Sequence, residues 1–402
     1  MIPVSRLLLA QSGGATAVIN SSLVGAISAA QQSGQIDAVA GARNGIEGLL
    51  AEDLIDLAAQ SPETLSRLSR TPSAALGTTR QKMTDEMAER ALEILASYGI
   101  DIVAFIGGND TADSAMRLAQ SARDRGQQLR VVSIPKTIDN DLPGTDHCPG
   151  YGSIARFIAQ ATRSSGIDTA ATAQLYPVKL IEVMGRNAGW VAASGALGQI
   201  DHSDPPHLIF FPERPVGSID GFLQEIAAAH AERGQVVAVI PETMRDRDGE
   251  PLSGNTVVWR DSFGHPYYGG PGPALTSAIQ ESLGLRARYD KPGTISRMFE
   301  QSASEPDLMG ARECGAAAVK LLIDGVSEVM VTIERTSNEP FEISTGYVAL
   351  ETVANQERLL PDSFIGPDGR SVTGAFREYA LPLIGGPLEP YGHLEDLPFR
   401  PE

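Results

Sequence analysis

The segment IPKTIDND, residues 134–141, follows the apolar run LRVVS at residues 129–133 and brings one lysine, one threonine and two aspartates together. An apolar β-branched run is typical of a buried parallel strand, and ligands of open α/β sheets bind beyond the carboxyl ends of such strands. Pro135 ends ladder pairing, so a loop at the sheet edge is predicted. The chemically active side chains of this loop are Lys136, Thr137, Asp139 and Asp141.

Two carboxylates beside an ammonium and a hydroxyl suit phosphoryl transfer. That reaction needs a base for the attacking hydroxyl, oxygen ligands for a metal, and cations where negative charge accumulates. The alternative is a solvated turn, because Asp and Asn are favoured in turns for local reasons.

Composition narrows the class of protein. The chain has 402 residues, of which 42% are hydrophobic, enough for two or three domains. A net charge of -18 argues against a broad basic surface for nucleic acid or an anionic membrane, so an anionic ligand needs a local cluster of Arg and Lys. Two cysteines, Cys148 and Cys314, give neither a disulfide framework nor a thiolate zinc site. With no segment resembling a signal peptide or a membrane span, a cytoplasmic protein is expected.

Apolar runs alternate with helical patterns in both halves of the chain, which predicts an α/β fold of two doubly wound lobes with a ligand cleft between them. Strands are expected at residues 7–10, 102–106, 129–133, 178–183, 208–211, 236–240 and 328–333, with another ending at 39–41. Helices are expected at residues 17–32, 85–98, 112–125, 154–164, 218–233, 274–283 and 304–323.

The remaining segments complete the predicted organisation. Residues 245–260 are polar and predict an exposed excursion, with a hairpin suggested by Val257 and Trp259, and residues 261–272 predict an irregular loop. The domains are expected to be residues 1–152, residues 153–345, of which parts of 290–345 return to the first lobe, and a wrapping segment at residues 346–402.

Two glycine-bearing turns are candidates for phosphate binding. QSGGAT, residues 11–16, lies between a strand and a helix, where Gly13 and Gly14 allow a phosphate to approach backbone amides and the helix dipole. The alternative is an ordinary tight turn. SAALGTTR, residues 73–80, ends in Arg80, which is either a clamp on the ligand or a solvated arginine.

The motif GGND, residues 107–110, follows the strongly apolar run IVAFI. Asp110, with the amide oxygen of Asn109, offers oxygen ligands for Mg²⁺ between phosphate groups. The alternative is a helix N-cap at Asp110 or Thr111, since both residue types cap well.

Taken together, QSGG, GTTR, GGND, PKTIDND, MGRNAGW at 184–190, PE at 241–242 and the R-x8-R segment at 288–297 resemble the phosphofructokinase family over roughly the whole chain, and most closely its pyrophosphate-dependent branch. The resemblance implies two Rossmann-like lobes. It also implies reversible, Mg²⁺-dependent phosphoryl transfer from pyrophosphate, held by the N-terminal lobe, to the 1-hydroxyl of fructose 6-phosphate, held by the second.

The resemblance implies a role for each matching residue. Asp139 is the expected base, with Asp141 beside it, Thr137 at the transferring phosphoryl group, and Lys136 and Arg186 offsetting its charge. The residues expected to bind the donor are Gly13, Gly14, Arg80, Gly108, Asp110 and Lys136. Those expected to bind the sugar phosphate are Thr137, Asp139, Met184, Gly185, Arg186, Glu242, Arg288, Tyr289 and Arg297, where the two arginine forks of the last segment suit a phosphate. Asn109 and Asp110 are the expected metal ligands.

Two positions favour pyrophosphate over ATP. The family's ATP users commonly have glycine where this chain has Lys136 and Asp110. A lysine ammonium neutralises a pyrophosphate leaving group, and an added carboxylate crowds and repels the α-phosphate of ATP. For Lys136 the alternative is a solvated loop lysine in a simple ion pair.

Three departures from the family pattern are visible. Asn109 replaces the first metal-site aspartate. Pro177 stands where many bacterial relatives have an arginine that reaches a neighbouring subunit, and Lys179 is the candidate substitute for that arginine. The segment at residues 244–272 is longer than the corresponding segment of short ATP users. The competing hypotheses are an ATP-dependent 6-phosphofructokinase, a sedoheptulose-7-phosphate kinase, and a non-catalytic regulatory subunit. No nucleic-acid or membrane partner is expected. The chain is expected to form a homo-oligomer, either a dimer or a tetramer.

Overall fold

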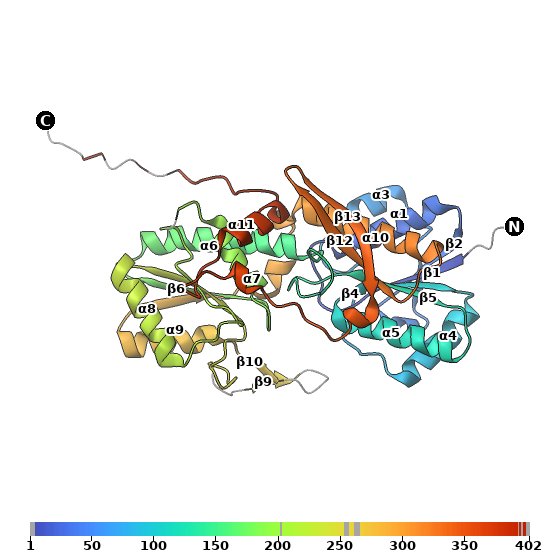
Figure 1. Ribbon diagram of the computed structural model, residues 1–402, viewed down its shortest axis with the longest axis horizontal. Helices are drawn as coiled ribbons and strands as arrows, with labels where there is room; N and C mark the ends of the chain where they lie inside the picture. Colours follow the sequence, from blue (N-terminus) through green and yellow to red (C-terminus); the bar gives the residue numbers. More distant parts are fainter. Residues whose placement is uncertain are drawn as a thin grey trace.

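Two α/β lobes lie side by side along the long axis of the molecule, each built on its own sheet (Figure 1). The computed structural model describes residues 5–201, 203–252, 257–260, 266–392, 394 and 397–398, and only the backbone of 257–260 and 266–268. The predicted two-lobed α/β architecture is confirmed.

The first lobe contains a seven-stranded sheet in the order β13-β12-β5-β4-β1-β2-β3. Its inner strands from β12 to β2 run parallel, while β13 and β3 are antiparallel edges. The strands are β1 (Ser5–Gln11), β2 (Ile36–Ala42), β3 (Leu54–Asp56), β4 (Ile102–Gly107), β5 (Arg130–Pro135), β12 (Val329–Asn338) and β13 (Phe341–Ala349). Every residue of β4 is buried, as expected for the centre of a sheet covered on both faces.

Helices cover both faces of this sheet and create two apolar cores. Helices α1 and α10 pack on one face, and α4 and α5 on the other (Figure 1). A Cβ at Gly315 of α10 would lie 2.0 Å from the carbonyl oxygen of Ser22, so glycine lets α1 and α10 cross closely. The helices of this lobe are α1 (Ile19–Ser33), α2 (Ile46–Leu50), α3 (Pro62–Leu68), α4 (Asp85–Ser97), α5 (Asn109–Asp124) and α10 (Glu305–Ile323).

The second lobe has a four-stranded parallel sheet in the order β11-β6-β8-β7. The strands are β6 (Val178–Val183), β7 (Leu208–Ile209), β8 (Val236–Pro241) and β11 (Ala287–Asp290), and β9 (Val257–Arg260) with β10 (Pro266–Tyr268) forms a separate antiparallel pair. The helices are α6 (Tyr151–Ala171), α7 (Trp190–Ala193), α8 (Ile219–Arg233), α9 (Pro271–Leu283) and α11 (Gly374–Ala380). Short 3-10 turns occur at Ser194–Gly198, Gly293–Arg297, Glu300–Ser302, Leu350–Thr352, Asp362–Phe364 and Pro382–Ile384.

The structure corrects several predicted elements. The hairpin suggested by Val257 and Trp259 is present, but the irregular loop predicted at residues 261–272 is wrong in part, because Pro266–Tyr268 pairs as β10 and α9 begins at Pro271. Residues 261–265 lie outside the described chain. Strands β3, β11 and β13 were not predicted, since their residues are largely polar or half-exposed and sequence hydrophobicity does not mark them. Helix α5 begins at Asn109, so part of GGND belongs to its first turn.

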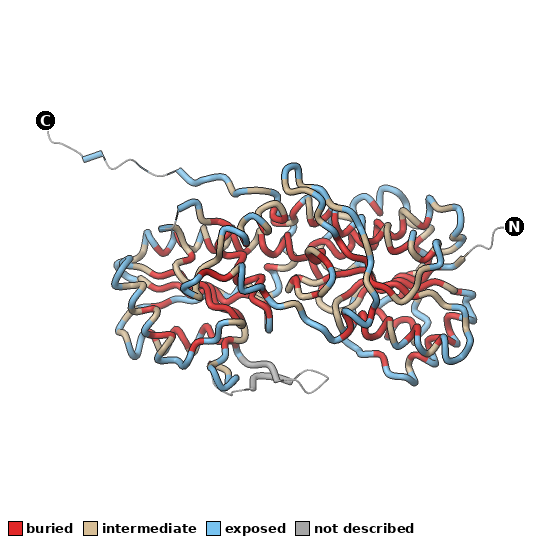
Figure 2. The backbone as a smooth tube through the Cα atoms, in the orientation of Figure 1, coloured by how far each residue is buried: buried red, intermediate tan, exposed pale blue. Residues whose placement is uncertain are grey.

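The chain returns to the first lobe after building the second. Strands β12 and β13 extend the first sheet, and the chain then crosses back to the second lobe, where α11 lies against it (Figure 1). Buried residues are concentrated in the two sheets and their facing helices, while the described residues after Leu388 are exposed (Figure 2). The predicted domain limits stay a prediction. Among the described residues, no helix has the length and apolarity to cross a membrane.

Candidate active site

Backbone hydrogen bonds draw four predicted loops to the carboxyl edge of the first sheet. The Lys136 amide donates to the Gly107 carbonyl at 2.9 Å, which joins PKTIDND to GGND. The Gly13 amide donates to the Thr79 carbonyl at 2.9 Å, which joins QSGG to GTTR. The parallel strands β1, β4 and β5 all end here, so their following loops meet in one place.

Two cations face the glycine turn. The Lys136 ammonium lies 3.1 Å from where a Cβ on Gly13 would be, and a guanidinium nitrogen of Arg297 lies 2.6 Å from where a Cβ on Gly14 would be. Lys136 is only 4% exposed although it is charged. Any side chain at either glycine would fill this space, so the two glycines and two cations form a cradle for a small anion.

The electrostatics of Lys136 fit a site that receives negative charge. Burial, followed by the nearby Arg297 charge, lowers the pKa of Lys136 to about 8, against the opposing attraction of Asp139 and Asp141. Arg80 contributes a further repulsion. Three cationic side chains therefore act on one buried point, which favours the binding of an anion there.

Asp139 and Asp141 are the carboxylates of the loop after β5. In the described part of the chain, the Oδ1 atom of each is buried without a hydrogen-bond partner. Burial, then the charges of Asp141 and Glu242, raises the pKa of Asp139 to about 7, and burial also raises the pKa of Asp141. A carboxylate whose pKa is near neutrality suits a general base. The Thr137 hydroxyl accepts a hydrogen bond from the Asp139 amide at 3.1 Å, which fixes the turn between them.

The second lobe contributes residues from the carboxyl ends of β6 and β8. A Cβ at Gly185, whose φ is +110°, would lie 3.9 Å from Asp139 Oδ1, and Met184 before it is half-buried against the lobe's core. The Glu242 amide donates to the Val183 carbonyl at 2.9 Å, and burial raises the pKa of Glu242. Arg186 is exposed, and its charge opposes this shift of Glu242.

Arg186 also borders a cavity of about 170 Å³ on the second-lobe side. Its lining includes apolar side chains from the ends of β7 and β8, such as Phe210 and Met244, and the exposed Arg214 and Arg245. Arg186 therefore lies between this cavity and Glu242, on which its charge acts.

The two predicted metal ligands are held by other protein groups. The Asp110 carboxylate, 65% exposed, pairs with the Lys82 ammonium at 2.8 Å. The Asn109 Oδ1 accepts from the Asp110 amide at 2.8 Å, and its Nδ2 donates to the Gln356 carbonyl at 3.3 Å. In the described residues, no group of three or more His, Cys, Asp or Glu side chains could hold a metal ion. A magnesium ion that arrives with substrate phosphates needs only one or two carboxylates, and the exposed Asp110 carboxylate could supply one. Gly108 lies beside this site, with a Cβ position 3.6 Å from the Lys136 carbonyl.

The predicted arginine pair is divided between two environments. Arg297 lies at the glycine turn, whereas the Arg288 guanidinium stacks on the Tyr176 ring at 3.5 Å from its centroid. Tyr289 is 42% exposed on the edge strand β11. Lys179, considered as a substitute for the arginine missing at Pro177, is buried in an ion pair with Asp290 at 2.9 Å.

Sequence reasoning missed residues 355–360, which we call the crossing segment because it touches both lobes beside the site. Asn355 Nδ2 donates to Asp113 in α5, and Asn187 of the second lobe donates to both Glu357 oxygens at 3.0 Å. The Glu357 charge raises the pKa values of Asp139 and Asp141. No signal in its polar sequence marked this segment, because its partners are as many as 247 positions away along the chain.

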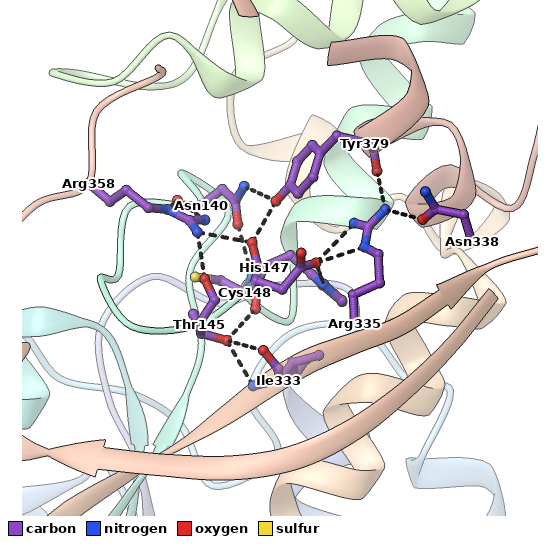
Figure 3. A network of polar contacts seen from close by, with 10 residues as sticks. Asn140, Thr145, His147, Cys148, Ile333, Arg335, Asn338, Arg358 and Tyr379 are labelled. Atoms are coloured by element: carbon purple, nitrogen blue, oxygen red, sulfur yellow. Dashed lines mark hydrogen bonds and ion pairs between the residues drawn. The ribbon is translucent and has the colours of Figure 1, made fainter. Parts of the chain in front are cut away.

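Arg358 of the crossing segment and Tyr379 of α11 contact the loop that carries Asp139 (Figure 3). The Arg358 guanidinium donates to the carbonyls of Asn140, Thr145 and Asp146, while the Tyr379 hydroxyl joins the Asn140 side chain to the Asp146 carbonyl. The catalytic candidates therefore rest on a layer of side chains from the C-terminal part of the chain.

Comparison with known proteins places these features in context. A family model described as Phosphofructokinase matches residues 6–322. A pyrophosphate--fructose 6-phosphate 1-phosphotransferase of Halomonas elongata is 38% identical over 386 residues, which cover 94% of this chain and 91% of that protein. A crystal structure of a pyrophosphate-dependent phosphofructokinase from Nitrosospira multiformis has a TM-score of 0.86 and 36% identity, and the match covers 98% of this chain and 95% of that one. A sulfofructose kinase of Alkalicoccus urumqiensis is 32% identical, covering 90% of this chain and 92% of that protein.

Proposed function

The chain belongs to the phosphofructokinase family, and from this premise we propose that it transfers a phosphoryl group reversibly from pyrophosphate to the 1-hydroxyl of fructose 6-phosphate, giving fructose 1,6-bisphosphate and phosphate. The observation that carries the proposal is the buried Lys136 ammonium, which faces Gly13 and shares its surroundings with Asp139. A donor-phosphate cradle and a candidate base therefore lie at one site.

Asp139 is the proposed base. Its pKa near 7 means that a large share of the molecules hold it unprotonated at neutral pH, ready to take the proton from the sugar 1-hydroxyl as that oxygen attacks phosphorus. The transfer moves the proton to the carboxylate and breaks the bridging bond of pyrophosphate, so that phosphate leaves. The charge of Asp141 raises the pKa of Asp139. Thr137 is proposed to contact the phosphoryl group that is transferred.

Cations offset the charge that develops during transfer. Lys136, Arg297 and Arg80 are proposed to bind the pyrophosphate over Gly13 and Gly14, because their charges already interact at this point. The family's ATP users commonly have glycine at the position of Lys136, which leaves space for the nucleotide, so the lysine supports pyrophosphate as the donor.

The acceptor is proposed to lie against the second lobe. Glu242, whose charge acts on Asp139, would accept hydrogen bonds from sugar hydroxyls. Met184, Gly185 and Arg186 would border the reacting group, since Gly185 lies next to Asp139. Arg297 is the proposed contact for the 6-phosphate as well as for the donor side. Arg288 and Tyr289 are proposed for the same phosphate, although their own contacts in this chain are with Tyr176 and Gly272.

Enzymes of this family use a divalent metal, and we propose Mg²⁺ for this chain. Asp110, once released from Lys82, and Asp141 would hold it together with substrate phosphate oxygens, with Asn109 nearby. When bound, the ion supplies charge neutralisation on the phosphates. A homo-oligomer and a cytoplasmic location are further proposals that the family resemblance supports.

Initial rates test the proposal. Formation of fructose 1,6-bisphosphate from fructose 6-phosphate and Mg²⁺ is measured with pyrophosphate or ATP at matched concentrations. We expect a rate with pyrophosphate alone. A rate with ATP alone would show that Lys136 and Asp110 do not select the donor, and a protein silent with both would favour a regulatory subunit or another acceptor.

One alternative to fructose 6-phosphate as the acceptor is suggested by the comparisons, because a sulfofructose kinase is 32% identical to this chain. Replacing fructose 6-phosphate by sulfofructose or sedoheptulose 7-phosphate in the same assay, with each donor, compares kcat/KM directly. We expect fructose 6-phosphate to have the highest value, and a higher value for either of the others would replace the proposed acceptor.

A further inference from the structure

Asn140 lies between the two catalytic candidates, and its side chain and its carbonyl are both held by hydrogen bonds. Its φ is 54°, in the left-handed region that asparagine tolerates better than most residues. It is fully buried. Its side-chain oxygen accepts from the Cys148 amide at 2.9 Å, and its Nδ2 donates to the Tyr379 hydroxyl at 2.9 Å.

Arg358 holds the backbone of the same residue and of the next. Its Nε and Nη2 donate to the Asn140 carbonyl at 3.2 and 2.8 Å, and its own amide donates to the Asp141 carbonyl at 2.6 Å. Its Nη1 reaches the carbonyls of Thr145 and Asp146, which closes the loop. The guanidinium stacks over Trp190 at 4.8 Å, so a second-lobe ring sets its plane.

A second layer supports Tyr379. The hydroxyl of Tyr379 donates to the Asp146 carbonyl at 2.8 Å, while Arg335 of β12 donates to the Asp146 carboxylate at 2.9 Å and to the Tyr379 carbonyl at 2.8 Å. The side chain of Arg335 is only 11% exposed. Figure 3 shows these groups converging on the loop from β12, α11 and the crossing segment. All three contributors lie beyond residue 322, where the match to the family model ends.

We propose that Arg358 and Tyr379 are positioning residues for phosphoryl transfer, which hold Asn140 in its left-handed conformation and thereby aim Asp139 at the sugar hydroxyl. The inference rests on the proposed function. Neither residue touches the reacting atoms. Asp139 and Asp141 flank Asn140, so a change in the backbone angles of Asn140 moves both carboxylates relative to the cradle around Lys136. A misplacement of about 1 Å can cost about 100-fold in rate.

Matched variants separate positioning from general stability. Arg358→Lys is compared with Arg130→Lys, since the Arg130 guanidinium also makes several hydrogen bonds, but to the Leu322 carbonyl, Ser5 and Asp101, at the opposite end of β5 from the loop. Tyr379→Phe is compared with Tyr98→Phe, which removes a hydroxyl that donates to a Glu52 carboxylate oxygen at 3.2 Å, at the end of α4.

The readouts are kcat and the KM values for both substrates, measured with whichever donor the wild-type protein uses. Arg358→Lys and Tyr379→Phe are expected to lower kcat about 10- to 100-fold while each KM stays within about twofold, and the two controls to keep kcat within about twofold. Equal losses in variants and controls, or raised KM values with an unchanged kcat, would overturn the positioning role.

Hydrogen exchange of the peptide covering residues 137–148 gives a readout that needs no turnover. Arg358→Lys and Tyr379→Phe should speed exchange there relative to their controls, and unchanged exchange would overturn the inference even if the wild-type protein were inactive with both donors. An inactive wild-type protein would refute the proposed function instead, so the two failures are distinguishable.

Discussion

The pH dependence of kcat/KM follows from two groups with opposite requirements. As the proposed base, Asp139, with a pKa of about 7, must be unprotonated, and as the proposed contact of the donor, Lys136, with a pKa of about 8, must be protonated. From these values, about three fifths of the free protein carries both groups in the required form at pH 7.5, and about one tenth at pH 6 or pH 9. We therefore expect a bell-shaped profile that falls about sixfold from its optimum to either of those pH values.

The perturbation that tests this reasoning is Lys136→Arg. A guanidinium stays charged to above about pH 12, so the alkaline fall of kcat/KM should disappear while the acid limb near pH 7 remains. Initial rates at low concentrations of both substrates, from pH 5.5 to pH 9.5 at constant ionic strength, measure both limbs. The phosphates of the substrates also ionise in this range, but they do so equally for both proteins, so the difference between the profiles reports residue 136.

Two results would refute the assignment. An alkaline limb that persists unchanged in Lys136→Arg would show that another group causes it. A wild-type profile that stays flat from pH 6 to pH 9 would show that neither burial nor the neighbouring charges shift Asp139 and Lys136 as their surroundings indicate.

Three further predictions concern the loops and their support. Asp139→Asn should lower kcat by at least about 100-fold, the usual contribution of a general base, while fructose 6-phosphate binding measured by calorimetry changes little; near-normal turnover would end the base assignment. Gly13→Ala should raise the KM for pyrophosphate, because the added Cβ would lie 3.1 Å from the Lys136 ammonium in a backbone conformation with φ of 76°, and an unchanged KM would argue against the cradle. Asp307→Ala should lower the midpoint of thermal unfolding. The buried Asp307 carboxylate accepts hydrogen bonds from the amides of Gly150 and Ser153 at the start of α6, and its removal leaves these two amides unsatisfied at a cost of about 1–3 kcal/mol. An unaltered midpoint would contradict this role of Asp307.

The metal arrangement shows where a correct motif does not by itself give a site. GGND lies at the end of β4 as its apolar run predicted, yet Asn109 begins α5 and Asp110 pairs with Lys82, whose position depends on a different loop. A motif identifies which oxygen atoms are available. The fold then determines which cation lies close enough to pair with an exposed carboxylate.

What the amino-acid sequence determined by itself is the succession of the apolar strands and of the long helices between them, together with the loops that carry chemistry. Apolar β-branched runs bounded by Pro and Gly are local signals, and they located β1, β4, β5, β6 and β8 with their polar ends. The segment IPKTIDND could therefore be recognised before any contact was known, because residues at the carboxyl end of one parallel strand stay together whatever surrounds them.

Tertiary structure alone decided what holds that segment in place. Arg358 lies 218 positions from Asn140, and Tyr379 lies 239 positions from it, so no local pattern pairs either residue with the loop. Their bonds form only because β12 and β13 return the chain to the first lobe and the crossing segment then carries it over the loop. Hydrophobic periodicity reports which face of an element is buried, but a hydrogen bond between distant residues depends on the complete path of the chain, which no local pattern contains.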